Sequence, residues 1–287
     1  MHLAPNCDVT MQSSALAFYS LVVCASVAVA WLLAQPLWLR WRRGRVRAGL
    51  FPSAWRAILR ERLPLVARLP ADLQLRLKQD MLVFLAEKPF LGCAGLVVSD
   101  EMRVTVAALA CLPLLGARRG YYPQLQRILL YPDAFWARHS RVGEDGVHNE
   151  GRQALSGQSW GEGQVLLSWN DVLQGAADPN DGRNVVIHEF AHQLDQAKGF
   201  ANGAPLLKSR RAYTAWSSVM QAEYDALHQR LGRGEDGLIE PYAATDPAEF
   251  FAVCSELFFE RPNDLAAQHA ELFAELRSYY RINPLSW

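Results

Sequence analysis

Two histidines stand four residues apart in the stretch 184–196, NVVIHEFAHQLDQ, and a glutamate directly follows the first of them. Side chains four apart share one face of a helix with 3.6 residues per turn, so His188 and His192 could hold one ion. Neutral imidazoles suit zinc, and a catalytic zinc ion takes three protein ligands and lowers the pKa of a water in its fourth position toward 7. Glu189 could accept the proton of that water and pass it to a leaving amine. The spacing therefore predicts the HExxH site of a zinc peptidase.

A third metal ligand must come from elsewhere, and the stretch 242–256, YAATDPAEFFAVCSE, carries two candidate carboxylates. Glu249 and Glu256 are seven residues apart and would share one face of a helix. Asp246 is a natural N-cap and Pro247 a natural first helical residue, so Glu249 could instead reach back to the Asp246 amide in a capping box. The residues alone leave the choice between the two glutamates open.

The elements that must position these residues mix early strands with helices, and helices dominate the later chain. Helical spacing over 54–87 should be broken into short helices by Pro64 and Pro70. Helices are predicted at 104–115 and over most of 213–281, polar loops at 143–157 and 175–182, and short strands at 96–100, 126–131 and 164–169. This order predicts an α+β domain with a small mixed sheet. The strand at 164–169 could form a sheet edge to which an extended peptide adds, or a plain core strand.

The amino-terminal part differs in kind from the rest of the chain. Residues 15–34 carry no charge and would span about 30 Å as a helix, the thickness of a bilayer's hydrocarbon core. Trp31 and Trp38 lie near one end, where interfacial aromatic residues belong. Arginines follow the apolar run, whereas a cleaved signal peptide carries its positive charge before the run. They are Arg40, Arg42, Arg43, Arg45 and Arg47.

The positive-inside rule therefore predicts a single-pass anchor in the cell inner membrane, with the folded domain facing the cytoplasm. The alternative is a cytoplasmic protein whose apolar helix docks on its own folded domain. A translation start at Met11 would leave the apolar run intact. The predicted organisation is a tail at 1–14, a transmembrane anchor at 15–38, a basic linker at 39–50 and a catalytic domain at 51–287.

Net charge and cysteine content argue against several classes of protein. The 29 basic and 29 acidic side chains balance, which argues against nucleic-acid binding by counterion release. The five cysteines are odd in number and none lies in a CxxC pair, which argues against a disulfide framework and against a thiolate zinc site. A reducing compartment is the simpler expectation for the folded part.

Four stretches resemble the Mlc titration factor A family of bacterial zinc metallopeptidases: HEFAHQLD, SGQSW at 156–160, the strand-like VLLSW, and DPAEFFAVCSELFF. The resemblance runs from about Phe51 to the end of the chain. HEFAHQLD followed by AEFFA is also similar to the catalytic domain of anthrax lethal factor, which implies a shared zincin-like core. Carried over by motif, the zinc ligands that the family implies are His188, His192 and Glu249, with Glu189 as catalytic base.

Further residues have counterparts in these relatives. Tyr242 stands seven residues before Glu249, where the toxin has a tyrosine assigned to the developing oxyanion; ordinary packing at a helix entrance is the alternative. His148, in GVHNEG, matches an additional zinc contact of the family, and a resting protein with His148 on zinc would inhibit itself. A surface histidine is the alternative. Asp195 could orient a histidine or cap a neighbouring turn.

The resemblance implies zinc-dependent, aminopeptidase-like hydrolysis of short peptides. The alternative function is that of a regulatory binding protein that sequesters a transcriptional repressor of sugar uptake, with the zinc site as scaffold. Members of the family are typically soluble, so a membrane anchor would depart from the family and would put a soluble repressor partner in question. The expected partners are a peptide substrate, a repressor protein in the alternative function, and the membrane, without direct nucleic-acid binding.

Overall fold

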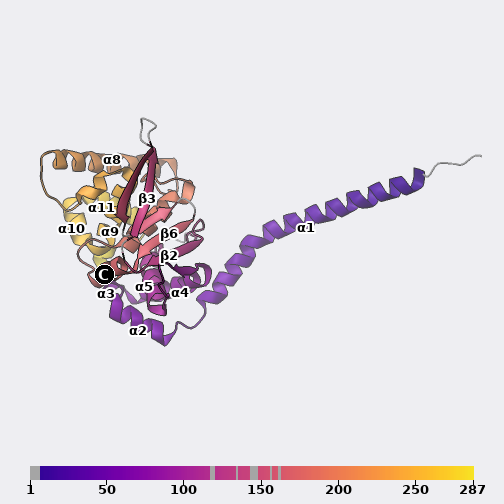
Figure 1. The fold of residues 1–287 in the computed structure, drawn as a ribbon, viewed down its shortest axis with the longest axis horizontal. Helices are drawn as coiled ribbons and strands as arrows, with labels where there is room; N and C mark the ends of the chain where they lie inside the picture. Colours follow the sequence, from indigo (N-terminus) through magenta and orange to yellow (C-terminus); the bar gives the residue numbers. More distant parts are fainter. Residues whose placement is uncertain (1–6, 117–119, 134, 143–147, 156, 161–162) are drawn as a thin grey trace, which may run out of the picture. The chain divides into compact units, whose positions relative to one another are not determined.

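The computed structural model describes residues 7–116, 120–133, 135–142, 148–155, 157–160 and 163–287. The chain divides into two compact units, residues 1–49 and 50–287. The described part of the first unit is built on one helix, α1 (Cys7–Arg47), drawn in indigo in Figure 1. Its stretch Phe18–Arg47 is long and apolar enough to cross a membrane by length and composition. Large apolar side chains such as Trp31 are exposed along this helix.

The second unit opens with three helices that are separated at prolines, as the sequence predicts. They are α2 (Ser53–Arg62), α3 (Pro64–Arg68) and α4 (Ala71–Glu87). Pro64 occupies the first turn of α3, where its missing amide costs no hydrogen bond, and Pro70 directly precedes α4. Helix α4 buries Leu77, Met81 and Phe84 completely, so it forms part of the core of this unit.

A four-stranded mixed sheet has the strand order β1-β2-β6-β5. The strands are β1 (Phe90–Gly92), β2 (Arg127–Tyr131), β6 (Gln164–Ser168) and β5 (Gly157–Trp160). Strands β1, β2 and β6 run parallel, whereas β5 pairs antiparallel with β6. Because β6 has a neighbour on both sides and buries Val165 and Leu167 fully, it is a core strand. The sheet-edge interpretation of this stretch is therefore wrong.

The strand expected at 96–100 is wrong: residues 96–99 form no regular secondary structure, and a helix begins at Asp100. Helix α5 (Asp100–Cys111) has Ser99 as its N-cap, and the Ser99 hydroxyl accepts a hydrogen bond from the Met102 amide at 3.2 Å. Acidic residues in the first turn add to the stability of this helix start. Val97 is 85 % exposed, so this β-branched residue gains no burial in a sheet. The helix predicted at 104–115 thus begins earlier, and the short helix η1 (Leu112–Leu114) follows it.

Two further strands, β3 (Phe135–Val142) and β4 (His148–Leu155), pair antiparallel in a separate two-stranded sheet. The polar loop expected at 143–157 is therefore wrong for residues 148–155 and for Gly157, which begins β5; residues 143–147 and 156 lie outside the described residues. Strand pairing depends on the backbone of a partner segment as well as on side-chain composition, so the polar residues of β4 did not reveal a strand.

The remainder of the second unit is mostly helical, as the prediction for 213–281 requires. The helices are α6 (Trp169–Ala177), α7 (Val185–Asp195), α8 (Arg210–Gly232), α9 (Pro247–Glu260), α10 (Pro262–Gln268) and α11 (Ala270–Tyr280). Helix α6 was not predicted: the strand ends at Ser168, which caps α6, and the loop begins only after Ala177. Helix α9 packs against α8, α10 and α11 (Figure 1), and α7 packs against α9 and β5. A mostly helical chain with a small mixed sheet agrees with the α+β prediction.

Candidate metal centre

Helix α7 presents both histidines of the HExxH motif because its start is capped and its other face is apolar. The Asn184 side chain accepts a hydrogen bond from the Ile187 amide at 3.2 Å, which satisfies one free amide of the first turn. Phe190 is fully buried in the core, which fixes the rotation of the helix about its axis. His188 and His192 lie one turn apart and both approach a carboxylate of α9.

Helix α9 begins where its capping residues predict. The Asp246 carboxylate accepts hydrogen bonds from the amides of Ala248 and Glu249, each at 2.9 Å, and Pro247 is at the start of the helix. The Glu249 carboxylate is directed at the imidazoles of α7 and not back at the Asp246 amide. The cap thus holds the turn that carries Glu249, while the Glu249 side chain is left for another role.

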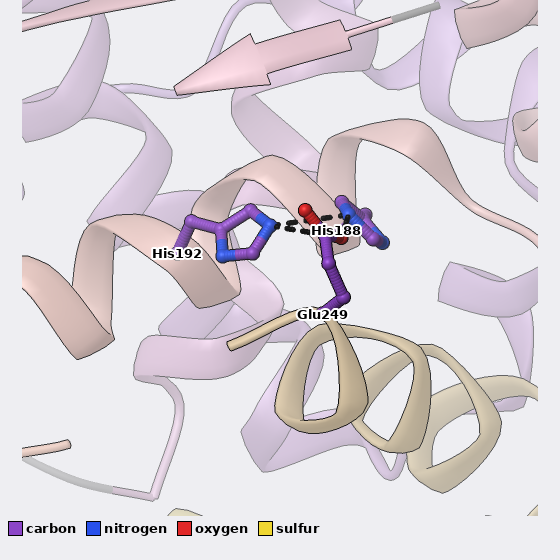
Figure 2. Close-up of side chains that lie close together, drawn as sticks. All are labelled: His188, His192 and Glu249. Atoms are coloured by element: carbon purple, nitrogen blue, oxygen red, sulfur yellow. Dashed lines mark hydrogen bonds and ion pairs between the residues drawn. The ribbon is translucent and has the colours of Figure 1, made fainter. Parts of the chain in front are cut away.

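Three side chains converge between α7 and α9, and Figure 2 shows them turned toward one another. Glu249 Oε2 lies 2.9 Å from His188 Nε2 and 3.4 Å from His192 Nε2, and the two Nε2 atoms are 3.2 Å apart. Ligand atoms around a tetrahedral zinc ion, with bonds of about 2.05 Å, are about 3.3 Å apart. The three residues therefore fit one such ion, with a fourth position of the tetrahedron left for another ligand.

The electrostatic environment of this cluster favours a cation. Both ring nitrogens of His188 face a carboxylate, Nε2 that of Glu249 and Nδ1 that of Glu256. Burial opposes charge on His188, but these carboxylates raise its pKa well above the ordinary value of 6.5. Burial would raise the pKa of Glu249, yet the hydrogen bonds to His188 and His192 hold that pKa well below its usual range. A divalent ion would supply the positive charge that a proton on His188 otherwise provides.

Glu189 directly follows the first histidine and is buried, with 4 % of its surface exposed. Its Oε2 atom has no hydrogen-bond partner among the described residues. Burial raises the pKa of Glu189 to about 7, although the charges of His188 and His192 lower it. A buried carboxyl with a free oxygen and a pKa near neutrality suits a general base, because it can both take up and release a proton.

Two further carboxyl groups, those of Glu256 and Glu260, lie at the start of α7. Glu256 Oε1 is 2.7 Å from His188 Nδ1, and Glu256 Oε2 accepts the backbone amide of Asn184. The Asn184 side chain donates to Glu260 Oε1 at 2.9 Å. Burial raises the pKa of Glu260 to about 8. Sequence reasoning weighed Glu256 only as a metal ligand and overlooked Asn184 and Glu260. The spacing of Glu249, Glu256 and Glu260 along one helix face could have pointed to Glu260.

Asp195 caps a turn and does not hydrogen-bond a histidine in the described structure. Its Oδ2 atom accepts hydrogen bonds from the amides of Asn202 and Gly203 at 2.8 and 2.7 Å. Gly203 has a φ of +74°, and a side chain at this position would collide with the backbone oxygen of Pro247. Asp195 therefore fixes the loop after α7 against the first turn of α9, the turn that carries Glu249.

Tyr242 lies in the short helix η3 (Pro241–Ala244), just before α9, and its ring centroid is 6.1 Å from that of His188. Partial burial and the neighbouring Glu249 carboxylate raise the pKa of its phenol, so the phenol keeps its proton at neutral pH and can donate a hydrogen bond. His148 is the first residue of β4, but its side chain lies outside the described residues.

Known proteins are similar in sequence to this chain over most of its length. A family model described as glucose-regulated metallo-peptidase M90 matches residues 38–281. An uncharacterized protein of Synechocystis sp. is 39 % identical over 258 residues, which cover 90 % of this chain and 94 % of that protein. Mlc titration factor A of Pectobacterium atrosepticum is 34 % identical over 235 residues, 81 % of this chain and 87 % of the relative. Mlc titration factor A of Klebsiella pneumoniae is 35 % identical over 228 residues, 78 % of this chain and 84 % of the relative. These similarities confirm the resemblance predicted from the motifs, and a metallopeptidase family implies a bound metal ion.

Proposed function

We propose that this chain, which belongs to the Mlc titration factor A family of glucose-regulated M90 metallo-peptidases, is a zinc-dependent peptidase with aminopeptidase-like activity and a zincin-like core. The observation that carries the proposal is the convergence of His188, His192 and Glu249, whose ligand atoms lie within 4.8 Å of one another. Two imidazoles and one carboxylate form the donor set of catalytic zinc sites in peptidases, and this chemistry supports zinc as the ion.

A zinc ion at these three residues would polarise the scissile carbonyl and lower the pKa of a water molecule beside it. Glu189 would take a proton from the attacking water and deliver it to the leaving amine. The free Oε2 atom of Glu189 and its pKa of about 7 support this role. Tyr242 would donate its phenol hydrogen bond to the oxyanion that develops on the carbonyl, and its place beside His188 supports that role.

The sheet supports a peptide as substrate. Strand β5 pairs with β6 on one side, and no described strand pairs with its other side. Helix α7, which carries the HExxH motif, packs against β5. An extended peptide can add to a free strand edge through backbone hydrogen bonds, which do not depend on its side chains. We therefore assign to β5 the substrate-binding role that sequence reasoning considered for residues 164–169.

Zinc content and cleavage of a chromogenic amino-acid amide test this proposal on the purified full-length protein. Glu189→Gln keeps the shape of the side chain but removes the base, so zinc content should stay at the wild-type level while kcat falls by about 10²–10⁴-fold. Glu235→Gln is the matched control, because Glu235 is exposed and forms a surface ion pair with Arg233. It should leave both quantities unchanged. A metal-free wild-type protein, or a Glu189→Gln variant that cleaves as fast as wild type, would overturn the proposal.

The name of the relatives, Mlc titration factor A, supports a second candidate function. In this function the chain binds a transcriptional repressor of sugar uptake, and the zinc site serves as scaffold. Glu189→Gln separates the two functions, because it should abolish hydrolysis without removing the metal. Reporter expression from a repressed promoter that still rises when the variant is produced would assign the regulatory effect to binding. If the variant loses both hydrolysis and the rise in reporter expression, the regulatory effect depends on catalysis.

We also propose that α1 anchors the chain in the cell inner membrane, with residues 51–287 in the cytoplasm. The apolar stretch of α1 and the arginines that follow it support this orientation. Arg42 lies over the Trp38 ring at 5.8 Å and Arg45 over the Trp41 ring at 5.1 Å, so cationic and aromatic side chains pair where lipid headgroups would lie. Reporter fusions at the carboxyl terminus test the orientation. A reporter that works only in the cytoplasm should be active, and activity of a reporter that works only in the periplasm would contradict the proposed orientation.

A further inference from the structure

We propose that Glu256 is a positioning residue that fixes the orientation and the tautomer of the His188 ring and thereby strengthens zinc binding. The inference rests on the metal site of the proposed function but concerns a residue outside the ligand set. It also resolves the choice between Glu249 and Glu256 that the sequence leaves open, because each glutamate has a different task at the same histidine.

One helix holds both edges of the His188 ring. Glu249 Oε2 is 2.9 Å from Nε2, and Glu256 Oε1 is 2.7 Å from Nδ1. The two glutamates are seven residues apart in α9, nearly two turns and about 10.5 Å along the helix axis. This separation admits an imidazole ring between the two carboxylates. Because Glu256 faces Nδ1, it lies on the side of the ring opposite the converging ligand atoms, and rotation of the ring would break at least one of the two contacts.

The Glu256 carboxylate is itself held in place by contacts that do not involve His188. Its Oε2 atom accepts a hydrogen bond from the backbone amide of Asn184, the residue that caps α7. The Asn184 side chain in turn donates to Glu260 Oε1 at 2.9 Å and to the Gly175 carbonyl at 3.0 Å. Glu256 is only 6 % exposed, so these hydrogen bonds form away from water, where loss of a partner is costly. Its position is therefore set by the start of α7 and the body of α9, before any ion binds.

A carboxylate at Nδ1 selects one tautomer of neutral His188. When Glu256 is ionised it can only accept hydrogen bonds, so Nδ1 then carries the proton and the lone pair is left on Nε2. Nε2 is the atom that faces Glu249 and lies 3.2 Å from His192 Nε2. The lone pair that a metal requires is thus directed at the ligand cluster. Loss of an outer carboxylate of this kind typically lowers metal affinity 10–100-fold.

Zinc affinity, measured on the full-length protein by competition with a chromogenic chelator, tests the role of Glu256. Glu256→Gln should bind zinc 10–100-fold more weakly than wild type. Glu271→Gln is the control, because it makes the same change of side chain at an exposed glutamate in the first turn of α11, outside the site. It should stay within a factor of about 3 of the wild-type affinity.

The visible spectrum of the cobalt-substituted protein provides a readout that general destabilisation would not move. A rotated His188 ring changes the ligand field, so Glu256→Gln should shift the cobalt bands while Glu271→Gln leaves them in place. If Glu256→Gln proves unfolded by circular dichroism, Glu256→Asp replaces it, since it keeps the charge but withdraws the carboxylate by one methylene. The same loss of affinity is expected. In cobalt-loaded wild type, the Nδ1 proton of His188 should also appear in proton NMR as an exchangeable signal that persists in water.

The outcomes separate this inference from the proposed function. Wild-type zinc affinity and unshifted cobalt bands in a folded Glu256 variant would overturn the positioning role and leave the metallopeptidase proposal intact. Absence of a protected Nδ1 proton in the wild type would also overturn it, whether or not the variants fold. A wild-type protein that binds no zinc would instead overturn the proposed function.

Discussion

Glu260 allows a direct test of the electrostatics behind the metal centre, because it is a carboxyl with only 2 % of its surface exposed. Burial raises its pKa from 4.5 to about 8; the hydrogen bond from Asn184 opposes this rise, and the charge of Glu256 adds to it. Glu260 should therefore carry a proton at neutral pH. The substitution Glu260→Gln keeps an oxygen to accept the Asn184 hydrogen bond but removes the ability to ionise.

The sign of the effect follows from proton linkage. The folded protein binds the Glu260 proton more tightly than the unfolded chain, so the stability from this group is fully present at low pH and is lost as pH rises from about 4.5 to about 8. Between pH 5.5 and 8.5 the loss in the free energy of unfolding is about 3 kcal/mol. The variant has no such proton to lose. At pH 5.5 the free energies of unfolding of the variant and the wild type should differ by no more than about 1 kcal/mol. By pH 8.5 the variant should have gained about 3 kcal/mol relative to the wild type.

Urea unfolding of the full-length protein in detergent, followed by tryptophan fluorescence, measures this difference at pH 5.5 and 8.5. Chelator in every sample keeps zinc release out of the comparison. Glu271→Gln serves as control, because Glu271 is an exposed glutamate in the first turn of α11 and should give the same difference from wild type at both pH values. If Glu260→Gln behaves like this control, Glu260 ionises normally and the reasoning about the buried carboxyls is refuted.

The remaining predictions concern the cap of α9, the phenol of Tyr242 and His148 of β4. Asp246→Ala removes the acceptor of two first-turn amides of α9, so it should lower the free energy of unfolding by about 1–2 kcal/mol and weaken zinc binding through Glu249; wild-type urea midpoints and zinc affinity would contradict this. Tyr242→Phe removes the proposed oxyanion donor and should lower kcat by about 10²-fold with little change in KM. An unchanged kcat would leave Tyr242 a packing residue. His148→Ala should raise peptidase activity or leave it intact if His148 blocks the resting site, whereas a steep loss of activity would count against self-inhibition.

Local sequence was sufficient to predict the two helices of the site. Asn184 precedes the apolar run of α7, Asp246 precedes α9, and Pro247 is the first residue of α9, so the residues that start each helix lie next to its first turn. The pairing of His188 with His192 needs only the periodicity of one helix. For the same reason the breaks of the early helices at prolines could be predicted from residue type alone.

Features that depend on the meeting of distant segments could not be predicted in this way. Glu249 and Glu256 share a face of α9, and only the axial position of α9 against α7 decides which of them meets Nε2 of His188. Strand β4 has a polar sequence and forms by pairing with β3. Residues 96–100 carry β-branched side chains, but with no partner strand to bury them the cap at Ser99 prevails. In each case the deciding interaction is with a segment that local periodicity does not identify.

The carboxyls around the two histidines show how one buried environment can hold groups in different protonation states. Glu249 is hydrogen-bonded to both imidazoles and has a pKa held well below its usual range, whereas the pKa values of Glu189 and Glu260 are about 7 and about 8. Burial alone does not explain the difference between the last two, since both are almost fully buried. The histidines lower the pKa of Glu189, and the Glu256 charge raises that of Glu260. Beside a bound divalent charge Glu189 would ionise more readily still, while Glu260, with Asn184 between it and the site, would keep its proton. A ligand, a base and an uncharged support can therefore coexist at neutral pH because each carboxyl has different neighbours.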